Sequence, residues 1–336
     1  MQYRELGQTG LKVSVIGFGG IPLQRIDLDQ GAQVVEKALA GGINFFDTAR
    51  GYTNSETKLG QLMKGRRQEV ILATKSMART KQAMAADVDR SLAELQTDYI
   101  DLYQLHNVKD QGALAQVLAS DGALAALKEA KAQGKIRHIG ITGHIPEILV
   151  KALQTGEFAT VQFPINIVEL TFVEKVLSLA KELQMGTIAM KPFAGGAVQG
   201  NRVNALRFIL EHGMDTVIPG MDAVAQVEEN LQAGQELPEL TSAERAKLEE
   251  EAGLLGETFC RRCEYCGPCP QGIDIPGVFL LEGYWSRYNL QGWARERYQP
   301  LVAKASDCIE CGKCEERCPY QLPIREMLKQ ADEHLR

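Results

Sequence analysis

Cysteine is absent from this 336-residue chain before residue 260, and all eight cysteines lie between residues 260 and 318. The chain also lacks an apolar run near the roughly 18 residues that a membrane-spanning helix requires, and its start, MQYRELGQTGLKVS, lacks the apolar core of a signal peptide. Basic residues are not in excess, because 37 Lys and Arg stand against 43 Asp and Glu. We therefore expect a cytoplasmic protein that binds no membrane and no nucleic acid. In that compartment, eight cysteines are more typical of metal ligands than of disulfides.

Short apolar runs alternate with helical segments over the first 240 residues. The apolar runs occupy residues 13–20, 43–49, 70–75, 100–106, 136–143, 160–166, 186–192 and 216–221. Such runs are typical of strands buried on both faces of a parallel sheet, and the segments between them repeat apolar residues at helical spacing. Eight strand–helix pairs predict an α/β fold, a (β/α)8 TIM barrel over residues 1–240. A hairpin over residues 3–14 is expected to plug its bottom.

The alternation stops near residue 235, and a different region follows. Residues 236–255, ELPELTSAERAKLEEEAGLL, predict one exposed helix that is capped by Thr241 or Ser242. The cysteines begin shortly after this helix. We therefore predict a second domain over residues 241–336, made of the linker helix and a small helical cysteine-rich region.

Polar side chains end three consecutive predicted strands. Asp47, Lys75 and His106 close the second, third and fourth strands, and Tyr52 lies in the loop after the second. Barrel active sites are built at the C-terminal ends of the strands, and buried charges are costly unless they are paired. These four residues therefore predict one small site at the mouth of the barrel.

This group of side chains suits the reduction of a carbonyl group. A free tyrosine has a pKa of about 10, but a neighbouring ammonium favours its phenolate. Lys75 supplies that ammonium, Asp47 keeps it charged, and Tyr52 protonates the oxygen of a carbonyl that receives a hydride. His106 is placed to hydrogen-bond the same oxygen.

With these residues in place, the sequence resembles the aldo-keto reductase superfamily. The matching segments are GINFFDTARGYTNSE, ILATKS, DLYQLHN, GKIRHIGIT, VQFPIN and VIPGMDAVAQVEENL. The resemblance covers roughly residues 1–240 and implies that the family's catalytic tetrad falls on Asp47, Tyr52, Lys75 and His106. It also implies NAD(P)H as the cofactor, bound without a Rossmann fold and without a metal. This agrees with the lack of a GxGxxG motif that opens a helix.

The same resemblance implies a set of contacts to the nicotinamide cofactor. Gln162 matches the glutamine that bonds the carboxamide, Thr142 stands where the family usually has Ser, and Met190 stands where many members stack a Tyr on the ring. Gly143 replaces the usual Asn, so one side-chain hydrogen bond is missing. The remaining implied contacts follow the last strand, and they are Gly220, Met221, Asp222, Gln226, Glu229 and Asn230, the last two matching adenine contacts.

Asp222 bears on the choice between NADH and NADPH. NADP-preferring relatives commonly have a basic residue soon after the position of Gly220, whereas this chain has Met221, Asp222 and Ala223. An aspartate would repel the 2′-phosphate and accept a hydrogen bond from a ribose hydroxyl, which favours NADH. The alternative is that Asp222 caps the next helix and carries no information about the cofactor.

The eight cysteines form two groups of four. These are Cys260, Cys263, Cys266 and Cys269, then Cys308, Cys311, Cys314 and Cys318. The second group is the C-x2-C-x2-C-x3-C-P run of bacterial ferredoxins, in which the last cysteine binds the other cluster. The first has two residues rather than three before its last cysteine, which leaves that exchange open. Zinc is the alternative, although four-thiolate zinc sites usually combine two CxxC knuckles across a longer loop. The region resembles a ferredoxin-type domain with two [4Fe–4S] clusters.

The segment between the two cysteine groups is rich in aromatic residues. One interpretation is a small helical insert whose aromatic side chains pack on the clusters or on the barrel. The other is a docking face for an electron-transfer partner. The aromatic residues are Tyr284, Trp285, Tyr288, Trp293 and Tyr298.

Two functional hypotheses follow. In the first, the barrel is an NAD(P)H-dependent reductase of a small-molecule carbonyl substrate, and the clusters are structural or exchange electrons with a redox partner protein. In the second, the chain is an electron-transfer or redox-sensing protein whose barrel is a nucleotide-binding scaffold with little reductase activity. The two halves differ chemically, because a nicotinamide delivers two electrons together and a cluster normally exchanges one, and no flavin motif connects them.

Overall fold

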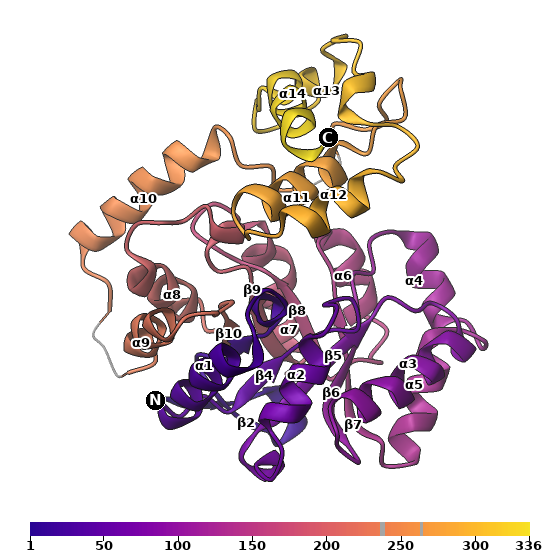
Figure 1. Cartoon of the computed structure of the whole chain (residues 1–336), viewed down its shortest axis with the longest axis vertical. Helices are drawn as coiled ribbons and strands as arrows, with labels where there is room; N and C mark the ends of the chain where they lie inside the picture. The colour runs from indigo at the N-terminus through magenta and orange to yellow at the C-terminus, as the bar shows by residue number, and fades with distance from the viewer. Residues whose placement is uncertain (236–238, 263–264) are drawn as a thin grey trace. The chain divides into compact units, whose positions relative to one another are not determined.

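The computed structural model describes residues 1–235, 239–262 and 265–336, and it divides into two compact units (Figure 1). The first unit comprises Met1–Pro192 and Asn201–Thr241, and the second comprises Phe193–Gly200 and Ser242–Arg336. The second unit therefore takes one segment from the middle of the first unit's sequence, which the alternation of strands and helices did not predict. In the described part of the chain, no helix has both the length and the apolar character needed to cross a membrane.

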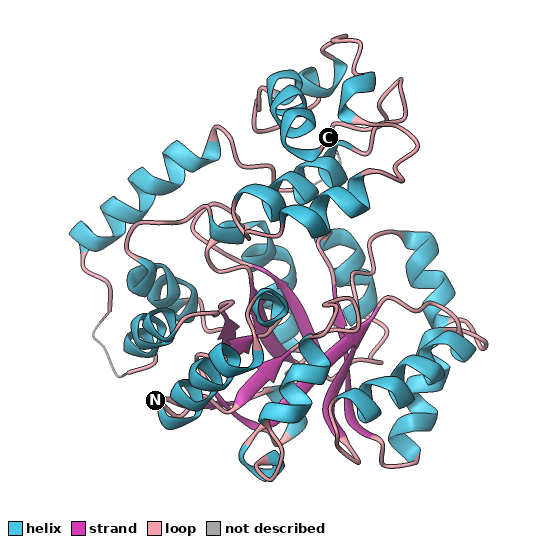
Figure 2. Ribbon diagram, in the orientation of Figure 1, coloured by secondary structure: helices cyan, strands magenta, loops and turns pink. Residues whose placement is uncertain are grey.

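Eight parallel strands form the centre of the first unit (Figure 2). Each strand pairs with the next one in the sequence, from β3 to β10. The ends of this row meet, because parallel bridges join Ile16 to Val217 and Gly19 to Gly220. The predicted (β/α)8 barrel is therefore confirmed. The strands are β3 (Phe18–Gly19), β4 (Phe45–Asp47), β5 (Ile71–Ser76), β6 (Ile100–Leu105), β7 (Ile136–Thr142), β8 (Thr160–Pro164), β9 (Gly186–Met190) and β10 (Thr216–Ile218).

The predicted hairpin is also present. Strands β1 (Tyr3–Glu5) and β2 (Lys12–Ser14) pair antiparallel around a short 3-10 turn at Gly7–Thr9. Leu6 is completely buried in a cluster with Phe45, Leu102 and Ile188 from the barrel strands. The hairpin therefore supplies a side chain that fills the barrel interior.

Helices follow the strands and surround them (Figure 2). Several begin at side-chain caps of the kind that short loops favour, such as Asp27 at α1, Thr80 at α3 and Asp110 at α4. The α-helices are α1 (Leu28–Ala40), α2 (Ser55–Leu62), α3 (Lys81–Glu94), α4 (Gln111–Leu118), α5 (Ala123–Ala132), α6 (Pro146–Leu153), α7 (Ser178–Glu182), α8 (Arg202–Glu211) and α9 (Val224–Ala233). Short 3-10 helices lie at Ile21–Arg25 and Arg67–Glu69, and a π-helical segment, Val173–Leu177, precedes α7.

All regular secondary structure in the described residues of the second unit is helical. Its elements are α10 (Ser242–Gly256), α11 (Ile275–Ser286), α12 (Gln291–Tyr298), α13 (Lys313–Glu316) and α14 (Ile324–Leu335), with 3-10 turns at Ala194–Gly196 and Ala305–Asp307. Helix α10 is the predicted linker helix; only Leu248 is buried along it, and the predicted residues 236–238 lie outside the described part. The buried Tyr298 hydroxyl donates to Asp332 and accepts from the Ala305 backbone, which ties α12 to α14.

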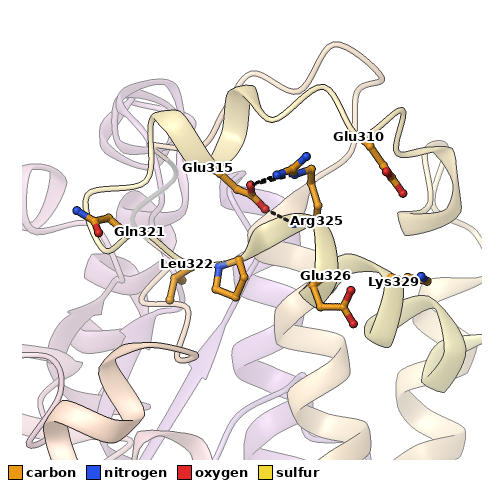
Figure 3. A pocket seen from close by; sticks show the side chains of 8 residues that line it. Glu310, Glu315, Gln321, Leu322, Arg325, Glu326 and Lys329 are labelled. Carbon is orange, nitrogen blue, oxygen red and sulfur yellow. Dashed lines mark hydrogen bonds and ion pairs between the residues drawn. The ribbon is translucent and has the colours of Figure 1, made fainter.

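A charged cleft of about 620 Å3 opens beside the second cysteine group (Figure 3). Glu315 on α13 accepts hydrogen bonds from both the backbone and the guanidinium of Arg325 on α14, at 2.8 and 2.9 Å. This pair anchors the helix that carries Cys314. The cleft is lined by Glu310, Glu315, Gln321, Leu322, Pro323, Arg325, Glu326 and Lys329.

The segment Phe193–Gly200 is held by two helices of the second unit. The backbone N–H groups of Gln199 and Gly200 donate to the Glu251 carboxylate at 3.0 and 2.9 Å. The guanidinium of Arg287 donates to the carbonyl oxygen of Gly195 at 3.1 Å. Most of the glycine-rich stretch 194–203 therefore belongs to the second unit.

Candidate active site

The four predicted catalytic side chains lie together at the C-terminal ends of neighbouring strands. Asp47 ends β4, Lys75 is in β5, His106 follows β6, and Tyr52 lies in the loop before α2. The Lys75 ammonium is 2.5 Å from the Asp47 carboxylate and donates to the Thr48 carbonyl oxygen at 2.9 Å. It also lies 5.1 Å from the centre of the Tyr52 ring, which meets the His106 ring edge to face at 6.2 Å.

Burial and neighbouring charges set the protonation of this group. Burial raises the pKa of Asp47 and lowers that of Lys75, and the attraction between the two opposes both shifts. The pKa of His106 is held well below its usual value near 6.5, first by burial and then by the positive charges of Lys75, Arg79 and Lys191. The His106 imidazole is therefore neutral near pH 7, and its Nδ1 is a buried atom with no hydrogen-bond partner among the described residues.

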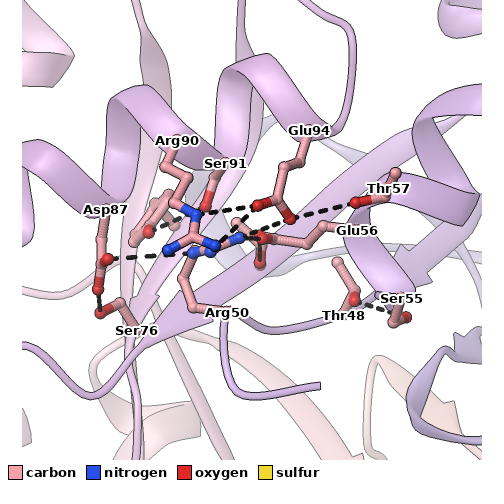
Figure 4. Close-up of polar contacts among 12 residues, drawn as sticks. Thr48, Arg50, Ser55, Glu56, Thr57, Ser76, Asp87, Arg90, Ser91 and Glu94 are labelled. Carbon is pink, nitrogen blue, oxygen red and sulfur yellow. Dashed lines mark hydrogen bonds and ion pairs between the residues drawn. The ribbon is translucent and has the colours of Figure 1, made fainter. Parts of the chain in front are cut away.

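A buried ion-pair network holds the loop that carries Tyr52 (Figure 4). Arg50 pairs with Glu56 and, at 2.9 Å, with Glu94 on α3. The other oxygen of Glu56 accepts from the Thr74 hydroxyl at 2.6 Å, which connects the network to β5. Burial lowers the pKa of Arg50, but the two carboxylates outweigh it and raise the pKa overall. The network was missed in the sequence, where Arg50 and Glu56 looked like ordinary polar loop residues on either side of Tyr52.

Gln104 is a second residue that the sequence did not single out. It is completely buried in β6, and its amide nitrogen donates to the side-chain oxygen of Gln162 at 2.8 Å. The same nitrogen lies 3.4 Å from the second oxygen of Asp47. The Gln162 nitrogen in turn lies 3.7 Å from the sulfur of Met190. A continuous polar chain therefore joins the Lys75–Asp47 pair to the predicted nicotinamide contacts. The only signal in the sequence was an amide inside an apolar strand.

The predicted nicotinamide contacts have a donor set that fits a carboxamide. The Gln162 amide and the Thr142 hydroxyl lie in adjacent strands at the same level, because Thr142 pairs with Gln162 in the register of β7 and β8. The Thr142 oxygen accepts from the Asn107 backbone at 2.8 Å and keeps its own proton for a ligand. A side chain at Gly143, such as the family's usual Asn, would be tightly packed, since a Cβ there would lie 3.2 Å from the Val108 carbonyl oxygen and 3.0 Å from Leu149.

The structure corrects the interpretation of Asp222. Its carboxylate pairs with the guanidinium of Arg25, which lies in the turn after β3. Helix α9 has Ala223 at its cap position and no side-chain cap, so the alternative that Asp222 caps this helix was wrong. The backbone N–H of Asp222 donates to the Gln226 side chain at 2.9 Å. The carboxylate that favoured NADH is therefore balanced by a cation that lies far away in the sequence.

The other predicted adenosine-side residues surround this turn. Met221 is completely buried, Asn230 is buried on α9, and Glu229 pairs with Arg202 at 3.6 Å. Gly220 bridges to Gly19 at the point where the barrel closes. A Cβ on Gly220 would come within 2.8 Å of Pro22, so the close approach of these two loops requires glycine there.

Cysteines surround two separate cavities in the second unit. The first is lined by Cys308, Cys311, Cys314, Cys266 and Cys269. The second is lined by Cys260, Cys266 and Cys318. The last cysteine of each group therefore lines the cavity of the other group, as in the ferredoxin pattern. Cys263 lies outside the described residues.

An all-thiolate lining fits iron–sulfur clusters. A cubane spreads its four cysteine ligands over four corners, so their sulfurs need not converge on one point. Within the described residues, no three His, Cys, Asp or Glu side chains converge as the ligands of a single ion do. The core of this unit also accounts for the aromatic insert, because Tyr284, Trp285 and Trp293 pack against the same cluster of residues as the cysteines. Packing was the first of the two interpretations of this insert.

Two family models match the chain. Residues 15–204 match the family model described as the aldo/keto reductase family, and residues 259–323 match that of a 4Fe-4S dicluster domain. The chain is 31% identical over 306 residues to L-galactose dehydrogenase of Arabidopsis thaliana, which covers 76% of this chain and 94% of that protein. It is 27% identical over 225 residues to the NADH-specific methylglyoxal reductase of Escherichia coli, which covers 58% of this chain and 68% of that protein.

The solved structures that resemble this chain include aldo-keto reductases. The holo form of aldo-keto reductase AKR11C1 from Bacillus halodurans is 28% identical and has a TM-score of 0.66, with 75% of this chain and 96% of that chain covered. A putative aldo-keto reductase from Pseudomonas aeruginosa is 26% identical with a TM-score of 0.61, and here 69% and 96% are covered. These structures match most of their own length, whereas about a quarter or more of this chain has no counterpart in them.

Proposed function

Because the chain belongs to the aldo/keto reductase family and carries a 4Fe-4S dicluster domain, we propose that this oxidoreductase reduces an aldehyde or ketone with NAD(P)H. The observation that carries the proposal is the buried Lys75–Asp47 pair, whose ammonium lies 5.1 Å from the centre of the Tyr52 ring. An ammonium in this position favours a tyrosine that gives up its proton.

Each side chain then has one task. The nicotinamide, when bound, supplies the hydride. Tyr52 gives its hydroxyl proton to the carbonyl oxygen, and the Lys75 ammonium stabilises the phenolate that remains. Asp47 holds Lys75 in place and keeps it charged. His106 is neutral, so one ring nitrogen carries a proton that can be donated to the same carbonyl oxygen without adding a charge. Thr142, Gln162 and Met190 would hold the nicotinamide.

The eight cysteines would hold two [4Fe–4S] clusters, and these would exchange single electrons with a redox partner protein. The exchanged lining of the two cavities supports this ligand set. Cys269 would complete the cluster held by Cys308, Cys311 and Cys314. Cys318 would complete the one held by Cys260, Cys263 and Cys266.

A second candidate function is electron transfer or redox sensing, with the barrel as a nucleotide-binding scaffold. The observation that favours it is the loosened nicotinamide site, where Gly143 offers no side chain and Met190 replaces an aromatic ring. A weakly held ring would bind the nucleotide without efficient hydride transfer. The two candidates differ in one property, which is turnover of a carbonyl substrate.

Anaerobically purified protein tests the proposal. The wild type and Tyr52→Phe are assayed with NADH and NADPH against small aldehydes, ketones and sugars, starting with methylglyoxal and aldoses because of the named relatives. We expect the variant to bind the cofactor normally and to lose about 100- to 10,000-fold in kcat, the usual contribution of a positioned general acid. Equal turnover by the variant would overturn the reductase mechanism. Tight nucleotide binding with no turnover by the wild type would favour the second candidate.

A further inference from the structure

We propose that Gln104 is a positioning residue that fixes the direction of the Gln162 amide, so that Gln162 can only donate a hydrogen bond to the nicotinamide carboxamide. The inference rests on the proposed nicotinamide-dependent function. It concerns a residue that touches neither the substrate nor the cofactor and acts only through Gln162.

The geometry places Gln104 between the catalytic pair and the cofactor site. In the register of the barrel, Gln104 pairs with Lys75 on one side and with Gly140 on the other. Its amide nitrogen lies 2.8 Å from the oxygen of Gln162 and 3.4 Å from the second oxygen of Asp47. Gln104, Gln162 and Asp47 are each at most 2% exposed, so water cannot substitute for these contacts.

The chain of hydrogen bonds has a direction that begins at Asp47. The Asp47 carboxylate pairs with the Lys75 ammonium and therefore only accepts hydrogen bonds. Gln104 must turn its nitrogen toward this carboxylate, because its oxygen would be repelled there. The same nitrogen then faces Gln162, which must present its oxygen in return. The Asp47 carboxylate thus orients Gln104, and because a side-chain hydrogen bond from Gln162 also acts on Asp47, both amides turn a nitrogen toward this carboxylate.

Gln104 keeps this orientation although its own oxygen gains nothing from it. The Gln104 Oε1 atom is buried and has no hydrogen-bond partner in the described structure. Gly140 provides the space, since a Cβ there would lie 3.0 Å from Cγ and 3.2 Å from Oε1 of Gln104. Leaving a buried oxygen unpaired costs free energy, so the two acceptors on Asp47 and Gln162 must hold the Gln104 nitrogen in place.

The consequence is a one-sided contact to the nicotinamide. The oxygen of Gln162 faces Gln104, whereas its nitrogen lies beside Met190, where the family places the ring. Gln162 therefore presents N–H donors to the carboxamide oxygen and turns its oxygen away from the carboxamide NH2 group. A free glutamine would be able to do either.

Two cofactor analogues separate these possibilities. The 3-acetylpyridine analogue of NAD+ keeps the carbonyl oxygen and lacks the NH2 group, whereas the thionicotinamide analogue keeps NH2 and replaces the oxygen by a poorer acceptor. Dissociation constants are measured by calorimetry on the anaerobic holoprotein, with the NADP+ series in parallel. We expect the acetylpyridine analogue to bind within about threefold of the parent and the thio analogue to bind about 2- to 10-fold more weakly, the range of one neutral hydrogen bond.

Variants at Gln104 then test the positioning role. In Gln104→Leu the Gln162 amide is free to turn, so we expect the difference between the two analogues to shrink toward one while the affinity for ADP-ribose, which lacks the ring, is unchanged. Gln104→Met, closer in shape, serves if the leucine variant does not fold. Thr160→Val is the matched control, because it removes another buried oxygen near Gly140 and leaves both glutamines intact.

Two outcomes would overturn the role of Gln104, and a third would overturn the proposed function. A wild type that prefers the thio analogue, or Gln104 variants that keep the wild-type ratio, would overturn the role of Gln104. A folded wild type that binds neither NAD+ nor NADP+ would overturn the proposed function itself.

Discussion

The ammonium of Lys75 lies 2.5 Å from the carboxylate of Asp47 inside the barrel, where both side chains are almost completely buried. Removal of one member leaves a buried charge without its partner, which typically costs about 3–5 kcal/mol. We expect Lys75→Met to lower the free energy of unfolding by about that amount and to abolish carbonyl reduction.

The double variant Asp47→Asn/Lys75→Met separates stability from catalysis. It removes both charges, so we expect it to recover much of the lost stability, as measured by urea unfolding, but none of the activity. Recovery of turnover in the double variant would show that the ammonium has no chemical role.

The depressed pKa of His106 predicts a specific dependence of stability on pH. Below about pH 6.5 the unfolded chain binds a proton at this histidine that the folded chain does not bind. The free energy of unfolding should therefore fall as the pH falls below about 6.5. This part of the slope should be missing in His106→Asn. Thermal or urea unfolding between pH 5 and 7.5 measures it, and identical slopes in the two proteins would contradict the prediction.

The Arg50–Glu56 pair predicts that the Tyr52 loop depends on a buried charge. We expect Arg50→Met to destabilise the fold by about 3–5 kcal/mol, because Glu56 is then buried without its cation. Lys128→Met is the matched control: it removes an exposed ion pair with Glu157 and should change stability by at most about 1 kcal/mol. Chemical unfolding of both variants measures these changes in the free energy of unfolding. Equal changes in the two variants would contradict the stabilising role of the network.

The Arg25–Asp222 pair predicts that cofactor preference depends on the balance of two charges. Asp222→Ala removes the carboxylate that pairs with this guanidinium and would repel a 2′-phosphate, so we expect kcat/KM to move toward NADPH by about tenfold, within the range of a charge-assisted hydrogen bond. Arg25→Met leaves the carboxylate unpaired and should move the preference toward NADH. Steady-state kinetics with both cofactors test this, and shifts of the same sign in the two variants would contradict it.

The exchanged cysteines predict which variants lose the same cluster. Cys269→Ala should lose the iron of the cluster that Cys311→Ala also loses, and Cys318→Ala should match Cys260→Ala. Each variant is expected to retain about half of the iron, and EPR spectra of the reduced proteins should fall into these two pairs. Pairing of Cys269→Ala with Cys260→Ala would show that each run binds its own cluster.

Much of the barrel was predictable because its rules are local. Short apolar runs mark the strands, and the segments between them repeat apolar residues at helical spacing. Because the C-terminal ends of barrel strands converge, the strand assignment also located Asp47, Lys75 and His106. Gln104 and Arg50 escaped because their importance arises from partners in other strands and helices. The Asp222–Arg25 pair was missed for the same reason, since 197 residues separate its members and no local pattern announces such a pair.

The contacts of the segment Phe193–Gly200 impose an order on folding during synthesis. It leaves the ribosome well before the groups that hold it, because Glu251 follows Gln199 by 52 residues and Arg287 follows Gly195 by 92 residues. At about 5–20 residues per second, the segment waits several seconds for these partners. The first segment of the second unit is therefore synthesised before the end of the first unit, and the second unit is complete only when its last helices emerge.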